Sequence, residues 1–331
     1  MNIECASEST IQTAASLLRE GRLVAFPTET VYGLGADATN DSAVQAIFEA
    51  KGRPSNNPLI IHVASVEQLF ECIDPSQCSQ QVLSYLTLLT PLWPGPLSVV
   101  LPRAQSISDV VSAGGTSVAV RIPANPVALQ LLREFGRPLA APSANVSNYV
   151  SPTTAEHVAS GLGDKVELII DGGTCTVGIE STVLSLLNDK PTILRPGSIT
   201  QEQLEAMLHC SIPVLKHIES ASAPIPSPGL LLKHYAPRTP VKLLSSVDEQ
   251  SLKQYQRVGV ILFDKKSSVP EHACVVSYAS TSGNPEEVAV NLFSQLRALD
   301  EQKLDVIAID SCESSGIGLA IMDRLARATH N

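Results

Sequence analysis

The chain has 331 residues, of which 44% are hydrophobic and 17% charged, so it has the composition of a globular protein and the length of two domains. Its net charge of −10 argues against a general nucleic-acid binder, and its aromatic content of 4% argues against a base-stacking surface. Seven scattered cysteines without a CxxC pair argue against a disulfide framework or a zinc site.

The amino-terminal stretch MNIECASEST contains neither a basic segment nor an apolar run, so we expect no secretory signal. No run of about 18 apolar residues follows, so we expect no membrane span. A reducing cytoplasm is the location that these features favour.

In chain order, the first predicted element is a helix from Ser9 to Leu18, with Ser9 and Gln12 spaced as a capping box. An apolar strand then begins at Leu23 and breaks at Pro27. Further helices are predicted at 42–51, 66–73, 80–89, 127–135 and 155–162, and further strands at 58–64, 97–102, 117–123, 138–141, 166–171 and 181–187. The irregular alternation predicts an α/β fold with a mixed sheet.

A proline-rich stretch separates this part of the chain from a second pattern. Residues 217–240 hold five prolines and predict an extended linker. Beyond it, strands and helices alternate, which predicts a small Rossmann-like parallel sheet, although no GxGxxG is present. The predicted strands are 241–246, 257–263, 273–279 and 305–310, and the helices are 286–302 and 316–329. We therefore expect domains at 1–216 and 241–331 joined by a linker at 217–240.

Common enzyme signatures are absent: the chain has no P-loop, no HExxH and no GxSxG. Polar turns at strand ends remain, in PTETVYGLG (27–35), KGRPSNNPLIIH (51–62) and APSANVSNYVSP (141–152). Each has a plain interpretation as well as a functional one. The first fits a capped turn leading into a helix, and the third fits an ordinary Asx or Ser turn.

Two cations, Lys51 and Arg53, flank a glycine at a predicted helix end. They either complement the helix dipole or form an anion-binding corner. His62 lies in an apolar strand, where a lone histidine is more often a satisfied core residue. Arg121 and Arg195 each end an apolar strand before a proline, which suits a guanidinium that binds a carboxylate or phosphate at the sheet edge.

No single motif is specific, but their order is. PTETVYGLG, KGRPSNNPLIIH, PGPLSVVLP, VRIP, APSAN, GIESTV and LRPG together closely resemble the YrdC-like family. The linker SPGLLLKHYAP and the domain after it resemble the long, two-domain form of the threonylcarbamoyl-AMP synthases. The resemblance implies a twisted mixed sheet with an open concave cleft, followed by a smaller Rossmann-like parallel-sheet domain.

The same resemblance implies a function. Members of the family condense L-threonine, bicarbonate and ATP into threonylcarbamoyl-AMP, with release of pyrophosphate, for the t6A modification of tRNA. We therefore expect a nucleotidyltransferase that passes its product to the t6A transferase machinery. Mg²⁺ is expected to arrive with ATP, since no carboxylate stands out as its ligand. No strong direct binding of nucleic acid is expected.

Site residues follow from the resemblance, motif by motif. The positions expected to take part in catalysis are Lys51, Arg53, Ser143 and Asn145. The positions that match ATP contacts are Arg53, Asn57, Ser117, Ser143, Ser151, Arg195, His234 and Tyr235. The positions that match threonine contacts are Thr30, His62, Arg121, Ala141 and Ser181. The family's linker reads close to SPGMKYRHYAP, so the contacts of Leu230–Lys233 are in doubt, whereas the HYAP end is intact.

No residue of this set looks like a covalent nucleophile, so the expected mechanism is positioning and electrostatic stabilisation, with the linker as a lid over the cleft. The main alternative is an RNA-binding module, against which the charge of −9 over residues 1–219 weighs (12 Lys and Arg, 21 Asp and Glu). A carbamoyl-transfer domain of hydrogenase maturation would carry CxxC pairs. A purely regulatory protein would have lost the site residues that are present here.

Overall fold

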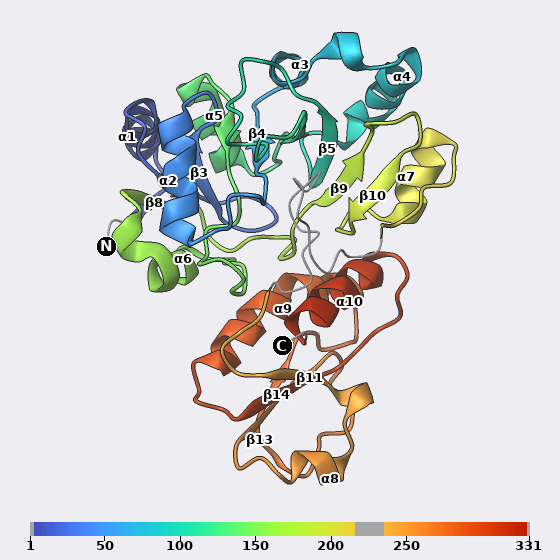
Figure 1. Cartoon of the computed structure of the whole chain (residues 1–331). Helices are drawn as coiled ribbons and strands as arrows, with labels where there is room; N and C mark the ends of the chain where they lie inside the picture. Colours follow the sequence, from blue (N-terminus) through green and yellow to red (C-terminus); the bar gives the residue numbers. More distant parts are fainter. Residues whose placement is uncertain (1–2, 216–234, 330–331) are drawn as a thin grey trace.

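Two β-sheets organise the chain (Figure 1). The structure is a computed structural model that describes residues 3–215 and 235–329. The first sheet has ten strands and uses residues up to Arg195, and the second has four strands and begins at Val241. The predicted fold class, a mixed α/β sheet followed by a separate parallel sheet, is confirmed. No helix within the described ranges is long and apolar enough to cross a membrane.

The large sheet mixes parallel and antiparallel pairs in the order β1-β8-β2-β3-β7-β4-β6-β5-β9-β10. Its strands are β1 (Ile3–Cys5), β2 (Val24–Phe26), β3 (Gly33–Asp37), β4 (Ile60–His62), β5 (Leu97–Pro102), β6 (Ser117–Arg121), β7 (Leu139–Ala140), β8 (Leu168–Asp171), β9 (Thr182–Ser185) and β10 (Thr192–Arg195). β4 and β6 are parallel neighbours, and His62 lies beside Arg121 in their register. This pairing brings two sequence-predicted site residues together.

Helices cover the two faces of the large sheet unequally. One core contains residues of α2 (Asp41–Lys51), α3 (Val66–Cys72), α4 (Gln80–Leu89), α6 (Ala155–Leu162) and α7 (Gln201–Leu208). On the other face, α1 (Glu8–Arg19) and α5 (Pro126–Phe135) pack against β2, β7 and β8. Beyond those helices, the described residues of the same face form a small cluster around Ile60, Ala119 and Val183. The pocket described below opens onto this part of the sheet, and Ile60 lines it.

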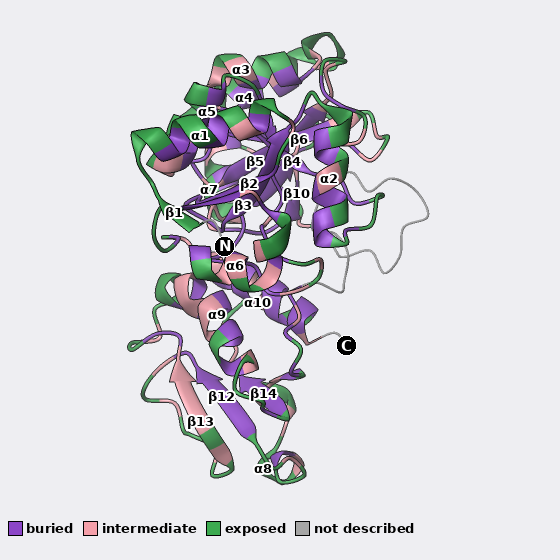
Figure 2. Cartoon of the chain, turned by 90° about the vertical axis from the view of Figure 1, so that its left-hand side faces the viewer, coloured by how far each residue is buried: buried purple, intermediate pink, exposed green. Residues whose placement is uncertain are grey.

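The carboxy-terminal sheet is entirely parallel, with strand order β11-β14-β12-β13. Its elements are β11 (Val241–Leu243), α8 (Glu249–Leu252), β12 (Val258–Leu262), β13 (Ala273–Tyr278), α9 (Pro285–Asp300), β14 (Val306–Ile309) and α10 (Ile317–Ala328). Its two long helices lie between the small sheet and the large domain in both views (Figures 1 and 2). The domain interface is therefore built from α9 and α10.

Several local predictions need correction. The first helix is capped by Ser7, whose Oγ accepts from the Thr10 backbone N–H at 3.1 Å, and not by Ser9. The PTET turn leads into strand β3 rather than into a helix, because Thr28 closes a turn that pairs β2 with β3 in antiparallel fashion. β1 and α7 were not predicted. The proposed linker 217–240 lies mostly outside the described residues.

Candidate active site at the domain interface

A pocket opens where the part of the large sheet that α1 and α5 leave uncovered meets the carboxy-terminal helices. Its wall comes from the turn between β2 and β3, the end of α2, the strands β4 and β6, and three later loops. The residues that line it are Thr28, Thr30, Val31, Gly33, Arg53, Ile60, His62, Arg121, Ala141, Pro142, Ser143, Glu180, Ser181, Arg195 and Tyr235. Nine of the sequence-predicted site residues are therefore in one wall.

At one end of the pocket, the PTET turn holds Arg121. The Thr28 hydroxyl accepts from the backbone N–H groups of Thr30 and Val31, each at 3.2 Å, which fixes the turn. Arg121 then donates from Nη1 to the Thr30 hydroxyl at 2.9 Å and pairs through Nη2 with Glu29 at 2.7 Å. Burial alone would raise the pKa of Glu29, but the Arg121 guanidinium outweighs it and lowers that pKa. The two charges at this end compensate each other.

His62 lies beside this pair and is held neutral. Burial, together with the positive charge of Arg121, lowers the pKa of His62 to about 3. Its ring packs edge-on against Phe26, with centroids 6.1 Å apart, and its Nδ1 has no hydrogen-bond partner among the described residues. A buried ring nitrogen without a partner is costly in a residue that serves only the core. The interpretation of His62 as a satisfied core histidine is therefore not supported.

At the other end, the KGRPSNNP corner is an internally bonded structure. Gly52 ends α2 in the left-handed conformation, with φ of 61°, which lets the chain turn between the two cations. Lys51 donates from Nζ to the carbonyls of Ser143 and Asn145, each at 2.5 Å. It therefore fastens the APSAN loop from behind rather than lining the pocket.

Arg53 faces the pocket and is oriented by the asparagine of the same motif. Its Nε donates to the Asn57 carbonyl at 3.0 Å, and its Nη2 donates to Asn57 Oδ1 at 2.7 Å and to the Pro58 carbonyl at 2.8 Å. Burial lowers the pKa of Arg53 to about 9. Asn57, predicted to contact ATP, is placed here as the group that orients Arg53.

The GIEST and LRPG loops form the third side. Arg195 donates to the Ser181 carbonyl at 3.1 and 2.9 Å and to the Ser181 hydroxyl at 3.1 Å, and that hydroxyl lies 2.8 Å from the hydroxyl of Ser98. The neighbouring Glu180 accepts from the Ser151 hydroxyl at 2.5 Å. Ser151, predicted to contact ATP, thus stands behind the pocket wall as a partner of Glu180.

Comparisons with known proteins agree with this arrangement. A family model described as "Telomere recombination" matches residues 16–197, and one described as "Threonylcarbamoyl-AMP synthase, C-terminal domain" matches residues 199–329. A threonylcarbamoyl-AMP synthase of Bacillus subtilis is 45% identical, over 96% of this chain and 92% of the relative. One from Pyrococcus abyssi is 42% identical, over 98% and 96%. The chain belongs to the threonylcarbamoyl-AMP synthase family.

A solved structure supports the same assignment over both domains. The crystal structure of P. abyssi Sua5 complexed with L-threonine matches with a TM-score of 0.85 and 40% identity, and covers 99% of this chain and 96% of that one. The sheets and the interface helices described above therefore belong to a fold that this chain shares with that protein over both domains.

Ser117, Asn145 and His234 need separate mention. Ser117 begins β6, four residues before Arg121, and does not line the pocket. Asn145 lies behind the wall, where its Nδ2 donates to the carbonyls of Val146 and Tyr149 and its Oδ1 has no hydrogen-bond partner in the described part of the chain. His234 and the altered linker positions Leu230–Lys233 lie outside the described residues.

Five charged residues of the site were not predicted from the sequence. Glu29 and Glu180 sit inside the quoted motifs PTET and GIEST, but nothing in their spacing marked them as partners of buried arginines. Asp323, Arg324 and Arg327 come from α10, more than 100 residues away in sequence. The available signal was their position among the apolar residues of an amphipathic helix, IGLAIMDRLARA, where charged side chains require buried partners.

Charge is distributed unevenly over the pocket. Arg121 is paired with Glu29, and Arg324 with Glu180 and Asp323. By contrast, Lys51, Arg53 and Arg195 are all buried, and their hydrogen bonds go only to carbonyls, an amide and a hydroxyl within the described ranges. Arg53 and Arg195, which both line the pocket, therefore have no hydrogen-bonded carboxylate among the described residues, which is an environment that an anion stabilises.

Proposed function

We propose that the protein is a threonylcarbamoyl-AMP synthase, which condenses L-threonine, bicarbonate and ATP into L-threonylcarbamoyl-AMP and pyrophosphate for t6A modification of tRNA. The observation that carries the proposal is the buried positive charge of Arg53 and Arg195, which both line the pocket, beside a second, charge-compensated end. The first end suits a triphosphate and the second suits a small zwitterion. Membership of the family supports the same reading.

Threonine would occupy the end formed by Thr30, His62 and Arg121. Arg121 retains N–H donors beyond those used by Thr30 and Glu29, and a guanidinium fork matches a carboxylate. The unpartnered Nδ1 of neutral His62 is available to a polar group of the amino acid. Ala141 and Ser181 would complete this end, since both line the pocket.

In the proposed reaction, the amine of threonine and bicarbonate form a carbamate with loss of water. A carbamate oxygen then attacks the α-phosphorus of ATP, and the bond to the bridging oxygen of pyrophosphate breaks. Charge grows on the leaving pyrophosphate, where Arg53 and Arg195 would stabilise it. The chain needs no covalent nucleophile for this nucleotidyl transfer, because holding the reactants in line lowers the barrier.

We propose that Mg²⁺ enters as the partner of ATP. The two carboxylates nearest the pocket, Glu29 and Glu180, are each engaged by an arginine, which makes them poor metal ligands. Where bicarbonate binds, the hand-over of product to a t6A transferase and a cytoplasmic location stay predictions. So does the absence of strong nucleic-acid binding.

The pocket as it stands is narrow, with a volume of about 50 Å³, compared with about 300–1,000 Å³ for typical ligand sites. ATP therefore requires that the pocket widen. Tyr235, which lines it and belongs to the end of the linker, is the side chain whose displacement would enlarge it, in keeping with a linker that acts as a lid.

Pyrophosphate release from ATP tests the function directly. The purified protein is assayed with ATP and Mg²⁺ alone, then with threonine, with bicarbonate and with both, and the adenylate product is identified by mass spectrometry. We expect release that depends on both substrates. Release that ignores them, or salt-sensitive binding of bare RNA with no need for ATP or threonine, would overturn the proposal.

A further inference from the structure

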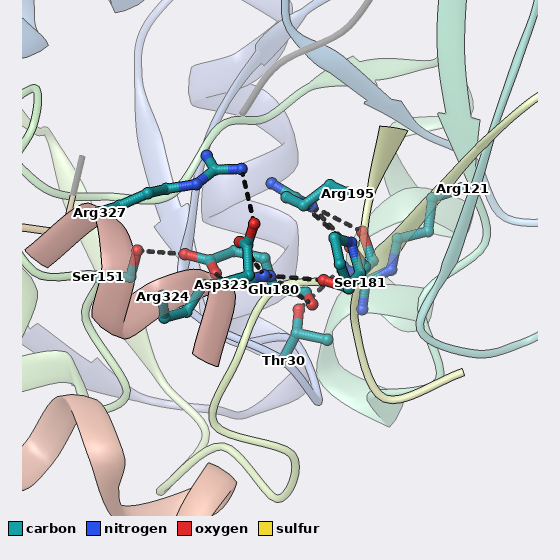
Figure 3. A network of polar contacts seen from close by, with 10 residues as sticks. Thr30, Arg121, Ser151, Glu180, Ser181, Arg195, Asp323, Arg324 and Arg327 are labelled. Atoms are coloured by element: carbon teal, nitrogen blue, oxygen red, sulfur yellow. Dashed lines mark hydrogen bonds and ion pairs between the residues drawn. The ribbon is translucent and has the colours of Figure 1, made fainter. Parts of the chain in front are cut away.

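Helix α10 of the carboxy-terminal domain places a fully buried arginine against the pocket wall (Figure 3). Arg324 pairs through Nε with Glu180 Oε2 at 3.0 Å, donates from Nη1 to the Pro196 carbonyl at 2.8 Å and from Nη2 to the Glu180 carbonyl at 3.3 Å. One side chain thus bonds the residue before Ser181 and the residue after Arg195.

Those two loops hold Ser181 and Arg195, and Arg195 lines the pocket. Ser181 and Arg195 are bonded to each other, so a shift of either loop moves the Arg195 guanidinium. Burial alone would raise the pKa of Glu180, but Arg324 and Arg195 outweigh it and keep the carboxylate ionised. Glu180 also accepts from the Ser151 hydroxyl at 2.5 Å. Arg324 therefore stands at one end of a bonded chain that reaches two predicted ATP contacts, Ser151 and Arg195, and one predicted threonine contact, Ser181.

The same arginine contacts the end of the linker. Tyr235 is fully buried with φ of 62°, a left-handed conformation that is unfavourable for an aromatic residue. Its ring lies 5.4 Å from the guanidinium of Arg324 and 5.8 Å from that of Arg327, and it stacks on Phe293 with centroids 5.3 Å apart. All three partners come from α9 and α10, so the carboxy-terminal domain alone supplies these ring contacts.

Simple interface packing would not require these groups. A buried ion pair loses much of its Coulombic gain to desolvation, and apolar residues of similar volume often stabilise an interface as well or better. Here the guanidinium instead spends its donors on Glu180 and Pro196, beside the site, and is oriented by Asp323 Oδ2 at 2.8 Å. These bonds are better explained if Arg324 sets the positions of the two loops than if it only holds the two domains together.

We propose that Arg324 is a positioning residue for the ATP end of the site, through which the carboxy-terminal domain fixes the loops of Ser181 and Arg195. The inference rests on the proposed function. It assigns the second domain a task within the reaction: without it, the residues that hold phosphate would be present but misplaced.

The test compares Arg324→Lys with Arg297→Lys in the full-length protein. Arg297 is a matched control, because it is an equally buried arginine of α9 that spans the same interface to the carbonyls of Val150, Ser151 and His157. Lysine keeps the charge but lacks the planar fork through which Arg324 bonds Glu180 and Pro196 from separate nitrogens. Kd values for ATP and for threonine are measured by calorimetry, together with kcat, both KM values and the Tm.

We expect Arg324→Lys to raise the Kd and KM for ATP about 10-fold and to lower kcat, with a smaller rise in the threonine values through the Ser181 loop. Arg297→Lys should lower the Tm similarly but leave the ATP values within about twofold. Equal changes in both variants, or a lower Tm with unchanged ATP values, would overturn the proposal. If Arg324→Lys does not fold, the paired variant Glu180→Gln with Arg324→Gln, which removes both charges of this ion pair, is measured instead against the same criteria.

The two proposals fail differently. If wild-type protein binds ATP and threonine but yields no adenylate, the proposed function fails, while the calorimetric comparison still decides the role of Arg324. If wild-type protein is active and Arg324→Lys matches it in every ATP value, only the positioning role fails.

Discussion

The two cationic sides of the pocket are built differently. At the KGRPSNNP corner, Lys51 and Arg53 are bonded to carbonyls and an amide of the large domain, and no carboxylate compensates them among the described contacts. At the GIEST side, arginines alternate with Glu180 and Asp323 across the domain boundary. The first corner therefore presents Arg53 through contacts within the large domain, whereas the position of Arg195 on the second side depends on the carboxy-terminal domain.

The largest effect on activity is expected at Arg53, whose guanidinium lines the pocket. Arg53→Ala should lower kcat/KM for ATP by about 10²–10³-fold, the usual loss when one fixed stabiliser of developing charge is removed. The Tm should also fall, because the Asn57 carbonyl, the Asn57 Oδ1 and the Pro58 carbonyl lose their buried donor. Steady-state kinetics and thermal unfolding check both parts. An unchanged kcat/KM would mean that this corner does not bind the phosphates.

Lys51 should behave differently, although it lies two residues away. Lys51→Met removes the donor to two buried carbonyls, those of Ser143 and Asn145, and should lower the free energy of unfolding by about 2–4 kcal/mol. Activity should fall because the APSAN loop loses its anchor. Urea unfolding of both variants separates the cases: if Lys51→Met is as stable as wild type, the lysine acts on the ligand and not on the loop.

Much of the fold was predictable because its signals are local. The helix 42–51 and its stop at Gly52, the strands 97–102 and 117–121, and the parallel second sheet all follow from apolar periodicity and caps. The antiparallel strand Gly33–Asp37 did not, because two glycines in five residues do not read as a strand. Its burial on both faces comes from neighbours distant in sequence.

In the site, too, the residues with local sequence signals could be predicted and those that depend on distant contacts could not. Residues inside ordered motifs, such as Thr30, Arg53 and Arg121, could be predicted as a set, and the structure brings them into one wall. Arg324 could not, because its role depends on a contact between residues 144 positions apart across two domains. Nor could Asn57 be predicted as the partner that orients Arg53, since a sequence names donors and acceptors but not their pairing.

The buried histidine at the charge-compensated end of the pocket predicts how stability depends on pH. The folded-state pKa of His62 is lowered from 6.5 to about 3, so below pH 6.5 the unfolded chain binds a proton that the folded protein does not. Its contribution to stability is complete above pH 6.5 and is lost as the pH falls toward 3, by about 1.4 kcal/mol per pH unit. Urea unfolding at pH 7, 6 and 5 should give a steeper loss for wild type than for His62→Gln. Parallel curves for the two proteins would contradict a buried neutral histidine.

The smallest expected effect tests how far the nucleotide extends from the cationic corner. Ser117 and Arg121 lie on the same face of β6, because side chains alternate, and about 13 Å apart along the strand. Between them lie Ala119 and its neighbour Ile60, an apolar surface that suits a nucleobase. If phosphates bind at Arg53 and the base lies along this face, Ser117→Ala should raise the KM for ATP two- to fivefold and leave kcat and the KM for threonine unchanged. An unaltered KM for ATP would limit the nucleotide to the pocket itself and remove Ser117 from the site.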